Sequence, residues 1–404
     1  MSTPTLLTPG PGQALRVADL VRQAAQLVPA LRARAAEAER LRRIPDETVA
    51  DLVNSGLLRI ATPTRYGGYG FDYDATLEVI VELARGCGST AWCFSIWSSH
   101  NWAVGFFPEE TQVEYFADGP DVLCASSVGP VGRAEPVAGG YRLSGHWEFS
   151  SGCDPATWNL LGASTPDGPI WTLVPRADFR ILDTWHVSGM RGTGSKDIVV
   201  EDAFVPTRRT VATAGLGLPP YDAYRLLKLP SYRLPVFSFF GWTLASPIVG
   251  LALAMVEEFT ERTVRLPARG RSPESVPMQT RLAEAAAEAD TARTIMRATC
   301  RELLDKAARE EDLTELERAR FFRDRAFAVK LSIDAVNRLF EASGGHALFE
   351  AEPIQRMHRD ALAASHRAGL ILDLGVGQVW ARAAFDAAAG APPGPVNNLP
   401  NIGA

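Results

Sequence analysis

In this 404-residue chain, a few histidine and serine side chains are of the types that suit acid–base chemistry. His100 lies in the aromatic run AWCFSIWSSHNW, and His366 lies in AASHRAG, near the end of the chain. A histidine titrates near neutral pH and is therefore a natural base for a hydroxyl proton. Ser150 and Ser151 lie near the end of the run SGHWEFSSG, and a hydroxyl group both donates and accepts hydrogen bonds. Without further context, such serines and isolated histidines are more often structural than functional.

Sequence motifs for a nicotinamide dinucleotide or a metal ion are missing. No GxGxxG is present, and GMRGTGSK at 189–196 only resembles a phosphate-binding loop. Its lysine lies one residue later than in the phosphate-binding motif GxxxxGK, and a strand pattern follows where such a loop is followed by a helix. We therefore predict a reduced, intracellular protein without a structural metal. The cysteines agree with this, since they form no CxxC pair: Cys87, Cys93, Cys124, Cys153 and Cys300.

The charge and hydropathy patterns exclude several classes of partner. The formal net charge is −6, so no overall basic field attracts nucleic acid or anionic lipid. The segment from Leu234 to Met255 carries no charge and is long enough to span a membrane. Because Pro235 and Pro247 interrupt it and Glu257 soon follows, we predict a buried core helix instead. The N-terminus lacks the pattern of a signal peptide, so we predict a cytoplasmic protein with a short disordered lead-in.

Three regions of different pattern follow one another along the chain. Residues 1–120 show the apolar spacing of helices, interrupted by the Gly-rich loop PTRYGGYGFDYD. Residues 121–212 contain short β-branched and aromatic runs separated by glycine, proline and aspartate, which predicts an antiparallel β domain, a barrel or a sandwich. Residues 213–404 contain a Pro-rich linker and four long amphipathic segments, which predict a helical bundle. The expected fold class is α+β.

The order and spacing of four segments resemble the acyl-CoA dehydrogenase superfamily over nearly the whole chain. These segments are ERLRRIPDETVADLVNSGLLRIATPTRYGGYG, SGHWEFSSG, VSGMRGTGSKDIVVEDAFVP and GGHALFEAEPIQRMHRDALAASHRAG. The resemblance implies an N-terminal helical domain, a central β-barrel and a C-terminal four-helix bundle, with flavin bound between them. It also implies a homotetramer.

One catalytic position of that superfamily is not kept. Its dehydrogenases use a carboxylate, placed shortly after the residues that Arg359 and Asp360 resemble, to remove a proton from the substrate. The matching position in this chain is Ala368, and the run FFGWTLASPIVG at the second known location contains no acid. Since alanine cannot accept a proton, we predict that this chain does not abstract an α-proton.

The sequence is instead similar to two-component flavin monooxygenases that share this fold, such as the hydroxyphenylacetate, dibenzothiophene and aromatic polyketide oxygenases. In these enzymes a separate NAD(P)H:flavin reductase supplies reduced FMN or FAD, and O2 adds at its C4a carbon to give a hydroperoxide that oxidises the substrate. The resemblance implies that Ser150, with Ser151 beside it, contacts the flavin near N5. It implies that His100 and His366 act as the base and as the group that steadies the peroxide. We therefore predict hydroxylation of a small aromatic or polycyclic molecule, in secondary metabolism.

Further positions carry weaker implications. Arg262 resembles the arginine that meets the flavin phosphate, whose oxygens suit a guanidinium group. Gly344 and Gly345 resemble paired glycines that let the backbone approach the flavin of a neighbouring subunit. The substrate is expected to lie against a flat apolar wall, for which the candidates are Trp97 and Trp102, with His358 as a further contact.

Other functions remain open on the sequence alone. An N- or S-oxygenase on the same scaffold, such as an amino-sugar N-oxygenase, would use the same residues. A dehydrogenase with an unrecognised base, and a flavin-binding scaffold without activity, are further alternatives. FMN and FAD are both compatible with the sequence.

Overall fold

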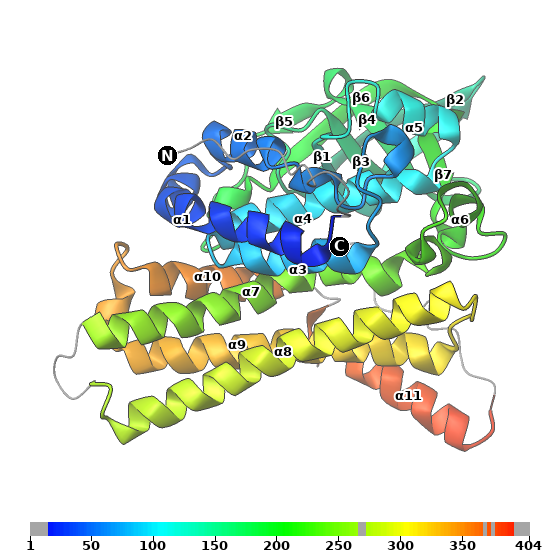
Figure 1. The fold of residues 1–404 in the computed structure, drawn as a ribbon. Coiled ribbons are helices and arrows are strands. Elements are labelled where there is room, and N and C mark those ends of the chain that lie inside the picture. Colours follow the sequence, from blue (N-terminus) through cyan, green and yellow to red (C-terminus); the bar gives the residue numbers. More distant parts are fainter. Residues whose placement is uncertain (1–14, 266–271, 367–369, 373–375, 392–404) are drawn as a thin grey trace.

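The computed structural model of the chain describes residues 15–265, 272–366, 370–372 and 376–391 (Figure 1). Its N-terminal region is helical: α1 (Val17–Leu41), α2 (Asp46–Asn54), α3 (Tyr73–Ala84), α4 (Gly88–Ala103) and α5 (Glu109–Tyr115). Gly56 follows α2 with φ of 71°, a conformation that glycine adopts without strain. Every residue of α4 except Trp92 is buried, and α4 contacts both the sheet and the bundle described below. This helix therefore connects the three regions.

The middle region is a seven-stranded sheet with the strand order β5-β6-β2-β1-β3-β4-β7. Its strands are β1 (Cys124–Val137), β2 (Gly140–Ser150), β3 (Trp158–Thr165), β4 (Gly168–Pro175), β5 (Arg180–Leu182), β6 (Lys196–Pro206) and β7 (Thr210–Ala212). The prediction of a wholly antiparallel domain is wrong in one place, since β1 and β3 are parallel. The chain forms the β1–β2 hairpin and then returns to the other side of β1, where β3 runs in the direction of β1.

The C-terminal region is a helical bundle beside the N-terminal helices (Figure 1). Its helices are α6 (Asp222–Leu227), α7 (Val236–Arg265), α8 (Val276–Ala308), α9 (Glu315–Ser343), α10 (Pro353–Ser365) and α11 (Gly377–Ala388). The bundle consists of α7, α8, α9 and α10, and α11 packs against α9. The last amphipathic segment of the sequence is therefore two helices, α10 and α11, instead of one.

The apolar segment from Leu234 to Met255 lies almost entirely within α7, the central helix of the bundle. This helix is long and apolar enough to cross a membrane, but 76% of its most apolar window is buried inside the protein. α7 contacts α3, α4, α8, α9 and α10, so its apolar sides are covered by other helices. The prediction of a core helix is therefore confirmed.

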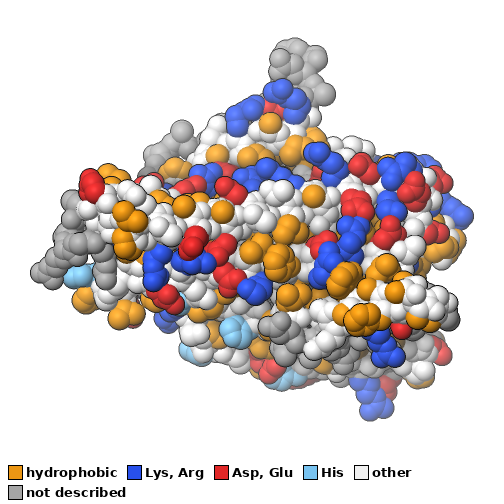
Figure 2. Space-filling model, turned by 90° about the horizontal axis from the view of Figure 1, so that it is seen from below, with side chains coloured by type: hydrophobic (Ala, Val, Ile, Leu, Met, Phe, Trp, Pro, Cys, Tyr) orange, Lys and Arg blue, Asp and Glu red, His pale blue; other side chains and the backbone are white. Residues whose placement is uncertain are grey.

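The face of the bundle seen in Figure 2 carries basic and acidic side chains close to one another. Apolar side chains form several small patches between them (Figure 2). A mixed surface of this kind provides no single-sign field for a nucleic acid, in agreement with the net charge of −6.

Candidate active site

A cavity lies where the N-terminal helices, the sheet and the bundle meet. Its enclosed volume is about 90 Å³, and two of its lining residues, Glu148 and Phe149, are exposed at the surface. A ligand larger than this volume must therefore extend past these two residues. The lining residues come from α4, β1, the end of β2, α7 and α9: Trp92, Ile96, Ser126, Ser127, Val128, Gly129, Glu148, Phe149, Ser151, Phe237, Phe240, Gly241, Leu244 and Arg325.

Aromatic and aliphatic side chains form the walls of this cavity. Trp92 and Ile96 are four residues apart on α4 and therefore lie on one face of that helix. Phe240 and Leu244 are likewise four residues apart on α7, and Phe237 precedes Phe240 by three, so these side chains also share one face of their helix. Flat apolar walls of this kind suit a planar ring system.

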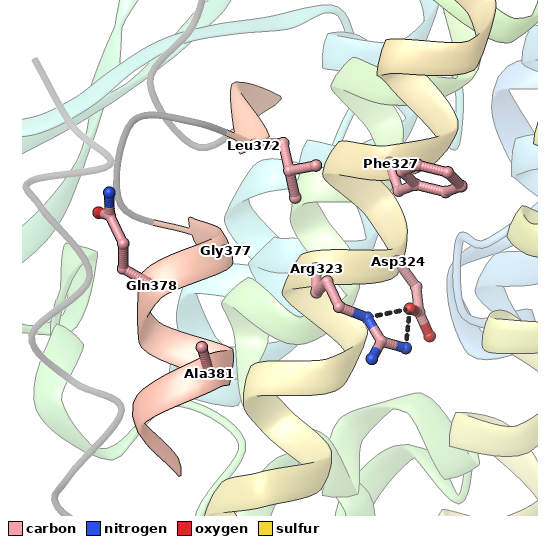
Figure 3. Close-up of a pocket in the computed structure, with 7 residues that line it drawn as sticks. All are labelled: Arg323, Asp324, Phe327, Leu372, Gly377, Gln378 and Ala381. Atoms are coloured by element: carbon pink, nitrogen blue, oxygen red, sulfur yellow. Dashed lines mark hydrogen bonds and ion pairs between the residues drawn. The ribbon is translucent and has the colours of Figure 1, made fainter. Parts of the chain in front are cut away.

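A wider groove of about 750 Å³ lies between α9 and α11 and contains none of the predicted site residues (Figure 3). The charged groups in it, Arg323 and Asp324, form an ion pair with each other at 2.5 Å. Its described lining contains neither a histidine nor a serine. We therefore place the candidate site in the smaller cavity.

Ser151 contributes a hydroxyl group to the cavity lining, and this group belongs to a chain of buried hydroxyls. The Trp92 indole N–H donates to Ser151 Oγ (3.0 Å), and Ser151 Oγ lies 2.7 Å from Ser195 Oγ. Ser195 Oγ lies 2.6 Å from Thr193 Oγ1, which donates to the Met190 carbonyl oxygen (2.8 Å). Sequence reasoning missed Thr193 and Ser195, because they lie in the GMRGTGSK segment, to which no motif assigns a role.

Ser150 lies inside the β domain and is not among the residues that line the cavity. Its side chain is fully buried, and its Oγ accepts a hydrogen bond from Asn159 Nδ2 (3.0 Å). The backbone turns sharply just before it, since Phe149 has φ of 63° and the register between β2 and β6 shifts here. This irregularity changes the faces of the following residues, so the cavity receives Ser151 instead.

His100 is buried in α4 beside the cavity. Its Nδ1 lies 2.7 Å from the Cys124 carbonyl oxygen, which can only accept, so Nδ1 carries the proton. Nε2 therefore has a lone pair, and it is buried without a hydrogen-bond partner among the described residues. Burial lowers the pKa of His100 to about 4. The ring centroid is 5.8 Å from that of Phe240, which lines the cavity.

Like His100, the other two candidate histidines are not among the residues that line the cavity. His366 caps the exposed C-terminal end of α10, and its Nδ1–H donates to the Leu362 carbonyl oxygen (2.6 Å). His358 stacks on Phe340 with 3.9 Å between ring centroids, and its Nε2 lies 2.9 Å from Asn337 Oδ1. Burial lowers the pKa of His358, which packs between α10 and α9. Ala368, which matches the position of the dehydrogenase carboxylate, lies outside the described residues.

Arg262 and the paired glycines lie at the other end of the bundle helices. The Arg262 Nε donates to Glu352 Oε2 (3.1 Å), so a carboxylate already accompanies this guanidinium. Gly344 ends α9 with φ of 66°, and a Cβ at Gly345 would meet nothing within 4 Å. The backbone of this loop is therefore accessible.

Trp97 and Trp102 are core residues and do not line the cavity. The Trp97 indole N–H donates to the Gly152 carbonyl oxygen (3.1 Å), and that of Trp102 donates to Ser231 Oγ (3.0 Å). The expected aromatic wall is instead supplied from α4 by Trp92. Helical spacing explains this, because positions 97 and 102 do not share the face of positions 92 and 96.

The polar groups around the cavity fit a planar heterocycle with polar edges. Arg325 places a guanidinium in the lining, and its Nη1 donates to the Phe237 carbonyl oxygen (3.3 Å). Gly241 makes room for it, since a Cβ there would lie 2.0 Å from Arg325 Nη1. Together with the Ser151 hydroxyl and the aromatic walls, this set suits a flavin ring. Within the described residues there is no cluster of histidine, cysteine or acidic groups suited to a metal ion.

Comparison with known families and proteins agrees with this arrangement. The N-terminal domain of acyl-CoA dehydrogenases matches residues 14–116, and their C-terminal domain matches residues 242–369. The oxygenase subunit HsaA of a flavin-dependent monooxygenase from Rhodococcus jostii is 37% identical over 347 residues, which cover 83% of this chain and 91% of that protein. The oxygenase component of the FADH2-dependent resorcinol hydroxylase from Rhizobium is 34% identical, with 88% of this chain and 91% of that protein covered.

A solved structure of similar fold contains flavin. It is XiaF from Streptomyces in complex with FADH2 and glycerol, with a TM-score of 0.81 and 30% identity over 93% of this chain and 96% of that chain. Both the sequence relatives and the fold thus indicate the same group of flavin-using proteins. This chain belongs to the acyl-CoA dehydrogenase superfamily, among the oxygenase subunits of flavin-dependent monooxygenases.

Proposed function

We propose that this protein is the oxygenase component of a two-component flavin-dependent monooxygenase that hydroxylates a small aromatic molecule. The observation that carries this proposal is the cavity between the three regions, which combines aromatic walls, the Ser151 hydroxyl and the nearby unprotonated Nε2 of His100. Relatives that are themselves oxygenase components of such enzymes support it.

Reduced flavin, when bound, supplies the two electrons with which one atom of O2 becomes water while the other enters the substrate. The residues of this chain have to exclude bulk water and set the positions of protons. Trp92, Phe237 and Phe240 exclude water from the reacting groups. His100 lies beside the lining residue Phe240, so a substrate hydroxyl that reaches past Phe240 meets Nε2. This atom can accept the hydroxyl proton because Nδ1 is already protonated, and loss of the proton makes the aromatic ring richer in electrons.

The remaining polar residues serve the flavin in this proposal. Ser151 meets the polar edge of the ring, and Ser150 supports the same turn through Asn159. His366 is the second acid–base group. Arg262 serves the flavin phosphate.

The protein works with partners in this proposal. A separate NAD(P)H:flavin reductase in the cytoplasm supplies reduced FMN or FAD. The subunits form a homotetramer, in which the loop at Gly344 and Gly345 contacts a neighbouring subunit. The related oxygenase components, which by name depend on a second component, support this division of labour.

Rapid mixing tests this function. The protein is loaded with anaerobically reduced FMN, or in a second series with FAD, and mixed with oxygenated buffer without substrate. We expect an absorbance transient that differs from both reduced and oxidised flavin and outlives the reoxidation of free flavin, because the closed cavity excludes water. Ser151→Ala should shorten its lifetime. Ser164→Ala is the matched control, because the Ser164 hydroxyl bonds to the Pro130 carbonyl at the exposed rim of the β domain.

Two outcomes contradict the proposal. Reoxidation at the rate of free flavin, with both FMN and FAD, would exclude an oxygenase. Reduction of the bound flavin by an organic substrate in the absence of a reductase would indicate a dehydrogenase.

A further inference from the structure

We propose that Thr193 and Ser195 are positioning residues that turn the Ser151 hydroxyl into a hydrogen-bond acceptor toward the cavity, so that the site prefers reduced over oxidised flavin. This inference rests on the proposed function, since it requires a flavin at Ser151. It assigns a role to a hydroxyl chain that lies behind the cavity wall.

The direction of the hydrogen bonds in this chain follows from its two ends. At one end the Met190 carbonyl oxygen can only accept, so Thr193 Oγ1 uses its single proton there (2.8 Å). Thr193 Oγ1 must then accept from Ser195 Oγ, 2.6 Å away. Ser195 has thereby used its own proton, so Ser151 Oγ is the donor in the 2.7 Å contact with Ser195.

The other end of the chain agrees with this direction. The Trp92 indole N–H is only a donor, and it donates to Ser151 Oγ at 3.0 Å. Ser151 Oγ therefore donates a hydrogen bond to Ser195 Oγ and accepts a hydrogen bond from the Trp92 indole N–H. One lone pair of the Ser151 oxygen has no partner in this chain. Because Ser151 lines the cavity, this lone pair is what the hydroxyl offers to a ligand.

Burial keeps water from rearranging these bonds. Thr193 is 1% exposed, Ser195 4% and Ser151 6%. A buried hydroxyl that loses its partner has no solvent molecule to replace it, so the hydrogen-bond direction is retained. The cavity wall thus has a preference for a ligand group that donates.

The two redox states of a flavin differ at the group that such a wall distinguishes. N5 carries a hydrogen and donates in reduced flavin, whereas in oxidised flavin it carries a lone pair and accepts. An acceptor at Ser151 forms a hydrogen bond with N5–H of reduced flavin and repels the N5 lone pair of oxidised flavin. The chain therefore favours the reduced form that arrives from a reductase and the release of the oxidised form after turnover.

Removing the Thr193 hydroxyl reverses the chain. In Thr193→Val, Ser195 loses its acceptor and can donate to Ser151, whose own proton then turns toward the cavity. The Met190 carbonyl keeps two other donors, the Thr193 backbone N–H (3.1 Å) and the Trp185 indole N–H (3.1 Å). The variant therefore leaves no buried acceptor without a partner and is expected to fold.

The experiment measures the dissociation constants of oxidised and anaerobically reduced FMN, and of both forms of FAD, for the wild type and four variants. We expect the ratio of the oxidised to the reduced constant to fall about three- to tenfold in Thr193→Val, as for the loss of one hydrogen bond. Thr193→Ser keeps the hydroxyl and should keep the ratio. Thr172→Val is the matched control, because it removes a buried hydroxyl bonded to a carbonyl (Leu161, 3.0 Å) outside the chain. Ser195→Ala should lower the ratio in the same way as Thr193→Val. It replaces Thr193→Val in the experiment if Thr193→Val does not fold.

Each outcome decides the inference. An unchanged ratio in folded Thr193→Val or Ser195→Ala would overturn it, as would an equal change in Thr172→Val. A raised substrate KM with an unchanged flavin ratio would show that the chain faces the substrate, which also overturns it. If the wild type binds neither redox form of FMN or FAD, the proposed function itself fails, which is distinct from flavin binding with an insensitive ratio.

Discussion

His100 shows how burial selects the protonation state of a single residue. Because the pKa of His100 is lowered to about 4, its imidazole is uncharged over the whole neutral range. A histidine of ordinary pKa, about 6.5, would be mostly protonated at about pH 6 and unable to act as a base. We therefore expect the rate of hydroxylation with saturating reduced flavin to stay within about twofold between pH 8 and pH 6.

His100→Asn tests the same residue by substitution. The asparagine amide can still donate to the Cys124 carbonyl, but the acceptor at the position of Nε2 is lost. We expect the protein to fold and bind flavin, while product formation falls about 100-fold, as for the loss of a general base. His146→Asn is the control, because His146 is exposed, pairs with Asp197 (2.7 Å) and is not among the residues that line the cavity. Equal product formation by wild type and His100→Asn would contradict the role of a base.

At the residue scale, the sequence identified the kinds of group but not which neighbour faces the cavity. The run SGHWEFSSG indicates a serine near a flavin, yet the choice between Ser150 and Ser151 depends on the irregular backbone at Phe149. Similarly, an aromatic helix predicts an aromatic wall, but only the three-dimensional contacts of α4 show that Trp92 provides it. Thr193 and Ser195 become visible as a chain only when residues 92, 151, 193 and 195 are brought together.

At the scale of elements, α10 is tied to the loop that carries the hydroxyl chain. The Met190 backbone N–H donates to Asp360 Oδ1 (2.6 Å), and Asp360 is buried on α10. Helix and loop also touch at Gly189, where a Cβ would lie 2.1 Å from the Arg359 carbonyl oxygen. The aspartate of the Arg-Asp pair therefore positions the backbone beside Thr193.

Asp360→Asn should stabilise the protein at high pH. Burial raises the pKa of Asp360 to about 6, against the ordinary 3.8 of an aspartate carboxyl. A raised folded-state pKa means that its stabilising contribution is complete below about pH 4 and is lost as the pH rises through 6. Asparagine keeps the oxygen that accepts from Met190 and has no charge to bury. Urea unfolding at pH 8 should give a free energy about 2–3 kcal/mol higher for the variant than for the wild type.

The same measurement near pH 4 is the control for Asp360→Asn. There the wild-type carboxyl is protonated in the folded state and about half protonated in the unfolded state, so the variant should be more stable by less than about 1 kcal/mol. A variant that is less stable than the wild type at pH 8 would show instead that neighbouring cations favour the carboxylate.

Elements were predictable where a pattern is local and not where pairing is distant. Helices and strands follow apolar spacing, so the strand pattern expected after GMRGTGSK agrees with β6. The parallel pairing of β1 and β3 has no such signal, because it depends on where the chain goes after Ser150. The division of the last segment into α10 and α11 was likewise not apparent, since apolar residues continue across it.

At the scale of the whole molecule, the cavity needs all three regions. Its lining extends in sequence from Trp92 to Arg325, and no single region supplies the aromatic wall, the hydroxyl and the guanidinium. The order of the regions was clear from the sequence and from its resemblance to a superfamily. The meeting of their residues at one place is a property of packing, and it requires α4 and α7 to approach closely at Gly88, where a Cβ would lie 2.9 Å from Leu251.

The predicted homotetramer can be tested at the loop after α9. Leu348 and Phe349 are 71% and 63% exposed there, next to Gly344 and Gly345. Large apolar side chains exposed side by side often mark a surface that another chain covers. We expect the double variant Leu348→Asp, Phe349→Asp to sediment as smaller species than the wild type, because two charges would be buried in the interface. Val131→Asp is the control, since Val131 is 61% exposed on β1, in another part of the molecule. A double variant that sediments as a tetramer like the wild type would exclude this loop from the subunit interface, whereas a wild type that sediments as a monomer would show that the tetramer itself was wrongly predicted.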